Sequence, residues 1–177
     1  MVGKVRPTSD RAREGLFSSL ISEFGDFEGV NFLDLFAGSG AIGLEALSRG
    51  AKVLHSVEKD ERAARTINAN IEIVKKGNIL GDVHLYSLSV EKFLELPAPL
   101  SYHIIYLDPP FELSDTDLYK SLLAIKVGGF LQKDGVIAVE RANKSARRGG
   151  LQWPEGFTAL RERNYGQALI YYGCLAG

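Results

Sequence analysis

Hydrophobic and polar positions follow two different periods along the chain. Apolar residues in 16–24 recur every three or four positions, which predicts an amphipathic helix over residues 9–24 that ends at Gly25. Short apolar runs then alternate with helical patterns. The expected strands are 30–36, 52–58, 83–86, 102–107 and 135–140, and the expected helices are 41–49, 60–74, 89–96 and 115–127. This alternation is typical of an α/β fold with a doubly wound, mostly parallel sheet.

The last two strand-like runs, residues 157–163 and 168–173, have no helix between them. They are therefore expected to form an antiparallel hairpin at one edge of the sheet, joined by residues 164–167. The sequence thus predicts a seven-stranded, Rossmann-like sheet with an N-terminal helix and an antiparallel C-terminal hairpin. Residues 144–150 are expected to form a mobile loop.

Composition places the chain among ordinary globular proteins. Its 177 residues are 45% hydrophobic and 24% charged, which suits a single domain over residues 1–177, and no apolar run has the length of a membrane span. Cys174 is the only cysteine, and the N-terminus has no apolar leader. A cytoplasmic protein without disulfides is expected. His55, His84 and His103 are scattered along the chain without ligand spacing, so no metal is expected.

Charge is unevenly distributed, although the net charge is only −1. Basic residues outnumber acidic ones in 1–14 and 141–163, whereas the stretch between them is acidic. If the two basic ends meet in space, they form a phosphate-binding face, which would include Arg147 and Arg148. Two separate solvated charge runs are the alternative interpretation.

A glycine loop, residues 37–43, follows the first strand. Small residues at the carboxyl end of a strand let a ligand approach the backbone, so this is a candidate nucleotide-cofactor loop. Glu58, at the end of the second strand, can accept the hydroxyl hydrogens of a ribose. The loop also satisfies the dinucleotide fingerprint, which leaves a NAD-dependent oxidoreductase open. Asp34 favours a cationic ligand group, an ammonium or a sulfonium, or else it is a buried acid that bonds to backbone amides.

A second candidate site follows the fourth strand. Asp108 and the carbonyl of a proline can accept two hydrogens from a planar amino group, while Phe111 stacks on the ring that carries it. Pro109 and Pro110 stiffen the backbone between them. We call these four residues the clamp. The alternative is a proline-stiffened turn with Phe111 in the core.

The glycine loop, Glu58 and the clamp occur in the order and register of the class I S-adenosylmethionine-dependent methyltransferases that carry an Asp-Pro-Pro-aromatic motif. Together with the blocks at residues 6–17 and 34–51, they resemble the bacterial small-subunit (16S) rRNA guanine-N2 methyltransferase family. The resemblance implies S-adenosylmethionine as cofactor and a flipped-out guanine at the clamp. It implies these site residues: Asp108, Pro109, Pro110 and Phe111 for catalysis; Asp34, Phe36, Ala37, Gly38, Ser39, Gly40, Glu58, Lys59, Ser89 and Val90 for the cofactor; Arg6, Thr8 and Arg11, with the basic pair Arg147 and Arg148, for RNA.

One position departs from the family pattern. Members often hold the adenine amino group with an acid after the third strand, where this chain has Ser89; its hydroxyl or the Val90 amide is expected to replace the acid. The resemblance further implies a monomer acting on small-subunit ribosomal RNA in an assembled or assembling 30S particle, with residues 1–25 as an RNA-contacting cap. DNA adenine-N6 and protein-glutamine methyltransferases share the clamp, so the clamp itself leaves those activities open, as well as a nonenzymatic RNA-binding module.

Overall fold

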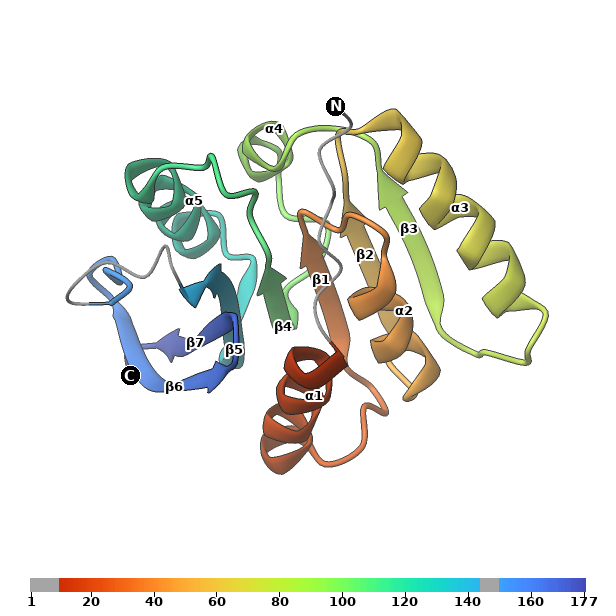
Figure 1. Cartoon of the computed structure of the whole chain (residues 1–177), viewed down its shortest axis with the longest axis horizontal. Helices are drawn as coiled ribbons and strands as arrows, with labels where there is room; N and C mark the ends of the chain where they lie inside the picture. The colour runs from red at the N-terminus through yellow and green to blue at the C-terminus, as the bar shows by residue number, and fades with distance from the viewer. Residues whose placement is uncertain (1–9, 144–149) are drawn as a thin grey trace.

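A computed structural model describes residues 10–143 and 150–177 of the chain (Figure 1). Its described part alternates helices with strands as the sequence predicts, and it contains a seven-stranded sheet. The elements in chain order are α1 (Asp10–Phe24), β1 (Asn31–Leu35), α2 (Ala41–Ser48), β2 (Val53–Val57), α3 (Glu61–Lys75), β3 (Asp82–Tyr86), α4 (Val90–Glu95), β4 (Tyr102–Leu107), α5 (Asp115–Val127), β5 (Leu131–Ala142), β6 (Phe157–Tyr165) and β7 (Ala168–Leu175).

The strand order is β3-β2-β1-β4-β5-β7-β6, so β3 and β6 lie at opposite edges of the sheet (Figure 1). The strands β1 to β5 are parallel, and β7 runs antiparallel to both β5 and β6. The predicted mixed sheet is therefore confirmed. The order reverses between β1 and β4, and in open α/β sheets ligands bind beyond the carboxyl ends of the strands at such a reversal.

Two hydrophobic clusters cover the two faces of the sheet. One contains side chains of α1 and α2, and the other contains side chains of α4 and α5. Successive residues of a strand point to opposite faces. Phe32 of β1 accordingly belongs to the α1–α2 cluster, while Leu33 and Leu35 belong to the other. Asp34 follows the same alternation, so this acid lies on the α1–α2 face.

The strand boundaries differ from the prediction near the C-terminus. β5 begins at Leu131, not at residue 135, because Leu131 pairs with Tyr102; the polar residues that follow form an irregular stretch of β5 before regular pairing begins at Val136. The turn between β6 and β7 is also shorter than expected, with Gly166 and Gln167 outside the strands and Gly166 at φ +74°. Of the expected loop at residues 144–150, residues 144–149 lie outside the described residues.

Two of the three histidines lie together in the sheet, although they are scattered along the chain. His55 and His84 are register partners on β2 and β3, with ring centroids 6.1 Å apart. His55 Nδ1 also lies 2.7 Å from the hydroxyl oxygen of Tyr102. Burial, followed by the neighbouring His84, lowers the pKa of His55. His103 is separate, and its Nδ1 accepts a hydrogen bond from the amide of Asn31.

This histidine pair makes a testable contribution to pH-dependent stability. Because the pKa of His55 is lower in the folded protein, the unfolded chain takes up a proton first as the pH falls through 6.5. The stabilisation is therefore present above that pH and is lost on acidification. Thermal unfolding between pH 5 and 8 should show a steeper acid loss for the native protein than for His55→Gln. Equal slopes in the two proteins would contradict this account.

None of the helices in the described ranges is long and apolar enough to cross a membrane. Nor do those ranges contain three His, Cys, Asp or Glu side chains grouped as they would need to be to hold a metal ion.

Candidate active site

A cavity of about 1680 Å³ opens at the carboxyl ends of the parallel strands. It brings together most of the residues that the sequence assigns to two separate motifs. Those that line it are Phe36, Ala37, Gly38, Ser39, Glu58, Lys59, Ser89 and Val90 from the cofactor set, and Asp108, Pro109, Pro110 and Phe111 from the clamp. The glycine loop and the clamp therefore face one space.

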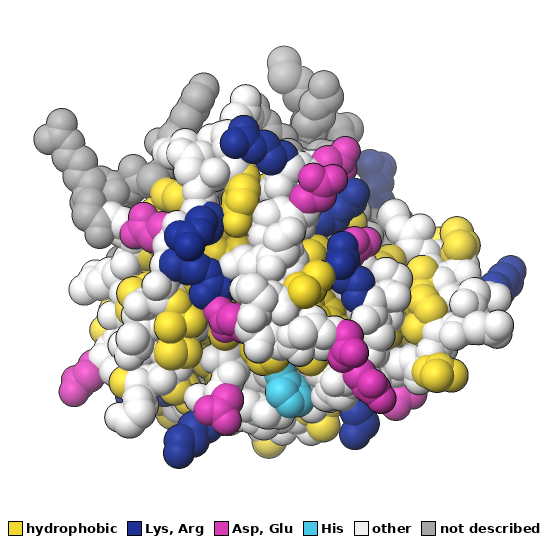
Figure 2. Space-filling model, turned by 90° about the horizontal axis from the view of Figure 1, so that it is seen from below, with side chains coloured by type: hydrophobic (Ala, Val, Ile, Leu, Met, Phe, Trp, Pro, Cys, Tyr) yellow, Lys and Arg dark blue, Asp and Glu magenta, His cyan; other side chains and the backbone are white. Residues whose placement is uncertain are grey.

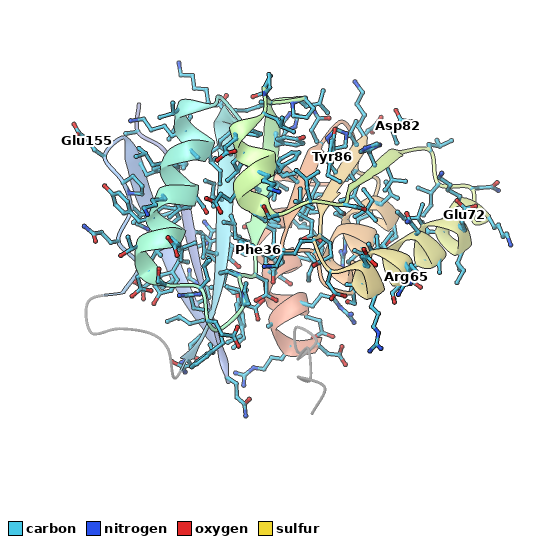
Figure 3. All side chains as sticks on the ribbon, turned by 90° about the horizontal axis from the view of Figure 1, so that it is seen from above. Phe36, Arg65, Glu72, Asp82, Tyr86 and Glu155 are labelled. Carbon is cyan, nitrogen blue, oxygen red and sulfur yellow. The ribbon has the colours of Figure 1, made fainter. Side chains whose placement is uncertain are left out.

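The glycine loop leaves β1 through a sharp left-handed turn. Phe36 has φ +59°, Gly38 has φ +57° and Gly40 has φ +79°. A left-handed conformation costs a non-glycine residue on the order of 1–2 kcal/mol, so Phe36 is a strained position at the cavity wall. Figure 3, seen from above the sheet, places Phe36 near the centre of the molecule. Gly40 caps α2, and a Cβ there would lie 3.0 Å from Cγ1 of Ile67.

Glu58 ties the end of β2 to the glycine loop. Its Oε2 accepts a hydrogen bond of 2.7 Å from the amide of Gly38, and its Oε1 accepts one of 2.9 Å from the amide of Asp60. Asp60 in turn caps α3 by accepting from the amide of Ala63. A carboxylate has about four lone-pair sites, so Glu58 keeps acceptor capacity for hydroxyl groups in the cavity that it lines.

Asp34 lies under the glycine loop and does not line the cavity itself, and the same is true of Gly40. The Asp34 side chain is 1% exposed, and its Oδ2 accepts a hydrogen bond of 3.3 Å from the amide of Gly43. Oδ1 has no hydrogen-bond partner among the described residues. Burial raises the pKa of Asp34 to about 8, the Gly43 amide opposes this shift, and the charges of Asp108 and Glu58 add to it. Both interpretations of Asp34 from the sequence are thus compatible, because an acid that holds the loop also favours a nearby cation.

The clamp is an exposed edge of the cavity. Asp108 follows the last residue of β4, and a turn is closed by a 3.0 Å hydrogen bond from the amide of Leu113 to the carbonyl of Pro110. Phe111 is 74% exposed. The alternative in which Phe111 packs in the core is therefore wrong, and its ring is accessible to a planar ligand.

Comparison with known proteins agrees with this arrangement. Residues 2–173 match the family described as conserved hypothetical protein 95. The ribosomal RNA small subunit methyltransferase D of Haemophilus influenzae is 33% identical over 163 residues, which cover 92% of this chain and 79% of that protein. Its namesake from Escherichia coli K12 is 32% identical over 163 residues, with 92% and 76% covered. The chain belongs to the bacterial 16S ribosomal RNA methyltransferase family. The family predicted from three sequence blocks is confirmed.

The family assignment extends to the fold. The solved structure of yhhF from Escherichia coli superposes with a TM-score of 0.81 at 28% identity, covering 97% of this chain and 89% of that one. The family is one of the class I methyltransferases, whose cofactor is S-adenosylmethionine. This structure fits that cofactor. Asp34 is a buried acid with an unpartnered oxygen, as suits a cationic group nearby, and Glu58 presents a carboxylate to the cavity.

Ser89 and Val90, the two residues expected to hold the adenine, both line the cavity. Ser89 is the N-cap of α4, and its hydroxyl accepts a 3.2 Å hydrogen bond from the amide of Lys92. This contact leaves the serine hydroxyl able to donate to a ligand. Val90 is buried and also lines the cavity. The expectation that one of these two residues replaces the usual acid stays a prediction.

Arg141 fixes the loop that follows the clamp. From the end of β5, its Nη2 donates to the carbonyl oxygen of Leu113 at 3.0 Å and to Oδ1 of Asp115 at 3.2 Å. The Arg141 side chain is nearly buried, so these contacts are shielded from solvent. Arg141 thereby connects β5 to the start of α5, across the turn that carries Phe111.

Loss of this contact should impair methyl transfer to the target base more than it weakens cofactor binding. Arg141→Ala frees the loop, and we expect about a tenfold lower kcat/KM for methyl transfer with the cofactor Kd unchanged within about threefold. Arg141→Lys keeps a positive charge and one donor, so it should lose less. Transfer kinetics and calorimetry on the same samples check this. An equal weakening of cofactor binding would show that Arg141 acts on the whole site.

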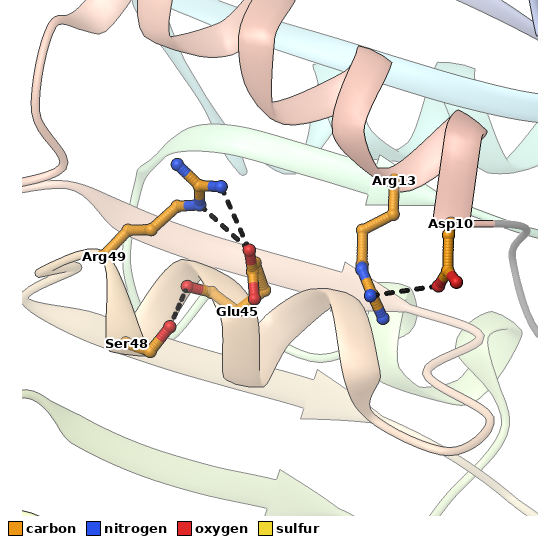
Figure 4. Close-up of polar contacts among 5 residues, drawn as sticks. All are labelled: Asp10, Arg13, Glu45, Ser48 and Arg49. Atoms are coloured by element: carbon orange, nitrogen blue, oxygen red, sulfur yellow. Dashed lines mark hydrogen bonds and ion pairs between the residues drawn. The ribbon is translucent and has the colours of Figure 1, made fainter.

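Sequence reasoning missed several residues that line the cavity. Glu140 lines it from β5 and Tyr106 from β4, and the hydroxyl of Tyr106 donates to Oε2 of Glu140. The available signal was the acid that ends the apolar run at 136–139. Arg13 also lines the cavity, at the first turn of α1, where it pairs with Asp10 at 3.1 Å (Figure 4).

The residues predicted to contact RNA are only partly described. Arg11 lies on α1 and does not line the cavity; its Nη1 would be 3.6 Å from a Cβ placed on Gly166. The other four, Arg6, Thr8, Arg147 and Arg148, lie outside the described residues.

Arg161 of β6, in the second basic run, packs against α1, but its partners there are at positions 19 and 23, outside the first basic run 1–14. The expected meeting of the two basic runs stays a prediction, because residues 1–9 lie outside the described residues. Arg161 donates to Ser19 Oγ at 2.9 Å, pairs with Glu23, and lies 4.3 Å from the ring centroid of Tyr172. Acidic side chains lie among the basic ones on the surface seen from below (Figure 2). This part of the basic surface is therefore partly neutralised.

Proposed function

We propose that this protein transfers a methyl group from S-adenosylmethionine to the exocyclic N2 amino group of a guanine in small-subunit ribosomal RNA. The observation that carries the proposal is the shared cavity, in which the glycine loop and Glu58 face Asp108 and the exposed Phe111. The names of its relatives, ribosomal RNA small subunit methyltransferase D, support RNA as the substrate. The choice of guanine N2 rests on the family resemblance.

The clamp activates and positions the target nitrogen. The lone pair of an exocyclic amino group is delocalised into the base, so the nitrogen is a weak nucleophile. Asp108 and the carbonyl of Pro109 accept its two hydrogens, which favours a pyramidal nitrogen with its lone pair directed away from them. Phe111 stacks on the flipped base, as enzymes that act on bases require. Positioning and electrostatics then provide most of the rate enhancement.

The opposite side of the cavity holds the cofactor. Glu58 binds the ribose hydroxyls, Phe36, Ala37, Gly38, Ser39 and Gly40 surround the methionine part, and Ser89 or Val90 holds the adenine. Lys59 lies at the rim of the same site. Asp34 favours the positively charged part through its buried carboxylate. When bound, S-adenosylmethionine supplies an electrophilic methyl group on a sulfonium, and the chain provides orientation and charge.

The remaining proposals concern the substrate complex. Residues 1–177 form a single methyltransferase domain, and residues 1–25 cover the site and contact RNA through Arg6, Thr8 and Arg11. Arg147 and Arg148 contact the RNA backbone. The chain acts as a monomer in the cytoplasm on an assembled or assembling 30S particle, where folded RNA already presents the target.

Methyl transfer onto small subunits from cells that lack the activity tests the function. Labelled methyl groups should appear in the ribosomal RNA, and mapping should locate them on N2 of one guanine. Label on DNA adenine or on a protein glutamine would overturn the proposal. Calorimetry with S-adenosylmethionine and with NAD addresses the cofactor, since tight NAD binding without a response to S-adenosylmethionine would favour an oxidoreductase. RNA binding without transfer would indicate a nonenzymatic module.

A further inference from the structure

The wall of the cavity carries more acidic than basic side chains. Among the described residues, nine acidic and four basic side chains line it, and the basic ones are Arg13, Lys59, Lys120 and Arg141. S-adenosylmethionine carries a sulfonium, an ammonium and a carboxylate. The two cationic groups suit acidic surroundings, whereas the carboxylate is repelled there unless a positively charged donor binds it. The four basic residues are therefore the candidates for holding the carboxylate.

Three of these four basic side chains are engaged or lie at another part of the site. Arg141 is held by two acceptors near the start of α5, and Lys120 pairs with an acid one turn before it on the same helix. Lys59 directly follows Glu58, the proposed ligand of the ribose. Arg13 remains as the candidate for the methionine end of the cofactor.

Arg13 lies at the end of α1 that faces the cavity beside α2. Phe17, four residues later on the same face of α1, packs against Arg49 at the C-terminal end of α2, with Cζ of Arg49 4.9 Å from the ring centroid. Arg13 lines the cavity from the first turn of α1, and Ala41 and Ile42 line it from the first turn of α2. Figure 4 shows the Arg13 side chain extending from α1 toward α2. Both helices thus present their N-terminal ends to the cavity, and α2 is the helix that the glycine loop enters.

The glycine loop itself offers few donors to a carboxylate. Its amides at positions 37, 38, 40 and 43 already donate to acceptors within the protein. Arg13, in contrast, has donors to spare. Within the described ranges its guanidinium makes one hydrogen bond, from Nη2 to Oδ1 of Asp10 at 3.1 Å. A guanidinium has five N–H donors in a planar fork, so Arg13 can still bind a carboxylate through two parallel hydrogen bonds.

We propose that Arg13 binds the carboxylate of S-adenosylmethionine, and that Asp10 is the counter-ion of Arg13 when the cofactor is absent. This inference rests on the proposed function, which places the methionine part at the glycine loop. The Asp10 side chain is 87% exposed, and an ion pair with such an exposed partner contributes little to stability. Exchange of Asp10 for the cofactor carboxylate therefore costs little. Arg13 then holds the methionine end of the cofactor while Glu58 holds the ribose.

Decarboxylated S-adenosylmethionine tests this role directly, because it keeps the sulfonium and the amino group and lacks only the carboxylate. Calorimetry should show that the native protein binds S-adenosylmethionine about 10–100-fold more tightly than this analogue, as expected for charge-assisted hydrogen bonds. Arg13→Gln should remove most of this difference, with the Kd of the analogue changed by less than about threefold. Arg13→Lys keeps the charge without the planar fork, so its affinity for S-adenosylmethionine should be intermediate.

Lys120→Gln is the matched control, because it also removes one positive charge from the cavity. It should leave the ratio of the two Kd values unchanged, and thermal unfolding of both glutamine variants should stay close to that of the native protein. Asp10→Asn removes the competing carboxylate and should tighten the binding of S-adenosylmethionine about twofold.

Two results would overturn the inference. One is an equal loss of affinity for both ligands in Arg13→Gln, because a structural role does not depend on the carboxylate. The other is an unchanged Kd for S-adenosylmethionine in Arg13→Gln with weaker binding to small subunits, which would assign Arg13 to an RNA phosphate. A native protein that binds neither ligand would instead overturn the proposed function, and the inference with it.

Discussion

Replacing Asp108 with Ala should lower the rate of methyl transfer by about 10²–10³-fold, while the cofactor Kd changes by less than about threefold. The size of the effect follows from the loss of a preorganised hydrogen-bond acceptor at the reacting nitrogen. Asp108 follows β4, whereas the proposed acceptors for the cofactor, Glu58 and Ser89, follow β2 and cap α4. Single-turnover kinetics with small subunits and calorimetry with the cofactor measure the two quantities separately.

Asp108→Asn is the matched control. The amide keeps an acceptor oxygen with nearly the same shape and removes only the charge, so its rate should lie between those of the native protein and Asp108→Ala. If Asn and Ala reduce the rate equally, the charge of Asp108 matters and its acceptor geometry does not. An unchanged rate in Asp108→Ala would remove Asp108 from the catalytic role.

Replacing Asp34 with Asn should stabilise the protein without cofactor and weaken cofactor binding about tenfold. The pKa of Asp34 is about 8 in the folded protein and 3.8 is its ordinary value, so between these pH values the unfolded chain releases a proton that the folded protein retains. The stability that Asp34 contributes is therefore complete below pH 3.8 and is lost as the pH rises to 8. The Asn variant does not ionise, so its free energy of unfolding should not show this loss, which is on the order of a few kcal/mol.

Cofactor binding should show the opposite pH trend. A cation in the cavity favours the ionised form of Asp34, so the affinity of the native protein should rise toward pH 8, and that of Asp34→Asn should rise less. The amino group of the cofactor titrates in the same range in both proteins, and the difference between them isolates Asp34. Denaturant unfolding at pH 5 and 8, with calorimetry at the same pH values, checks both trends. If Asp34→Asn is less stable than the native protein at pH 8, the hydrogen bond from the Gly43 amide to Asp34 stabilises the fold more than the buried charge destabilises it.

The sequence predicted the sheet because its central strands β1, β4 and much of β5 are buried apolar runs and its helices alternate with them. β5 was predicted too short because residues 132–134 are polar; they form an irregular stretch between the pair Leu131–Tyr102 and the regular pairing that begins at Val136–Ile104. A hydrophobic pattern alone does not reveal a strand that continues through such an irregularity.

The candidate site was predictable where local sequence determines local structure. The glycine loop and the clamp are each continuous in sequence, and their meeting followed from strand order. The contact between Glu140 and Tyr106 joins residues 34 positions apart and depends on the adjacency of β4 and β5. The pairing of His55 with His84 likewise depends on the register of β2 and β3. Such contacts between strands have no signal in the spacing of a single segment.

The buried carboxyl group of Asp34 also gives a direction to cofactor exchange. Its ionised form should attract a sulfonium while the methyl group is still attached, since the sulfonium carries a full positive charge. After transfer the sulfur is a neutral thioether, and this part of the attraction is lost. Asp34 should therefore hold the fresh cofactor more strongly than the spent one, which favours product release and reloading.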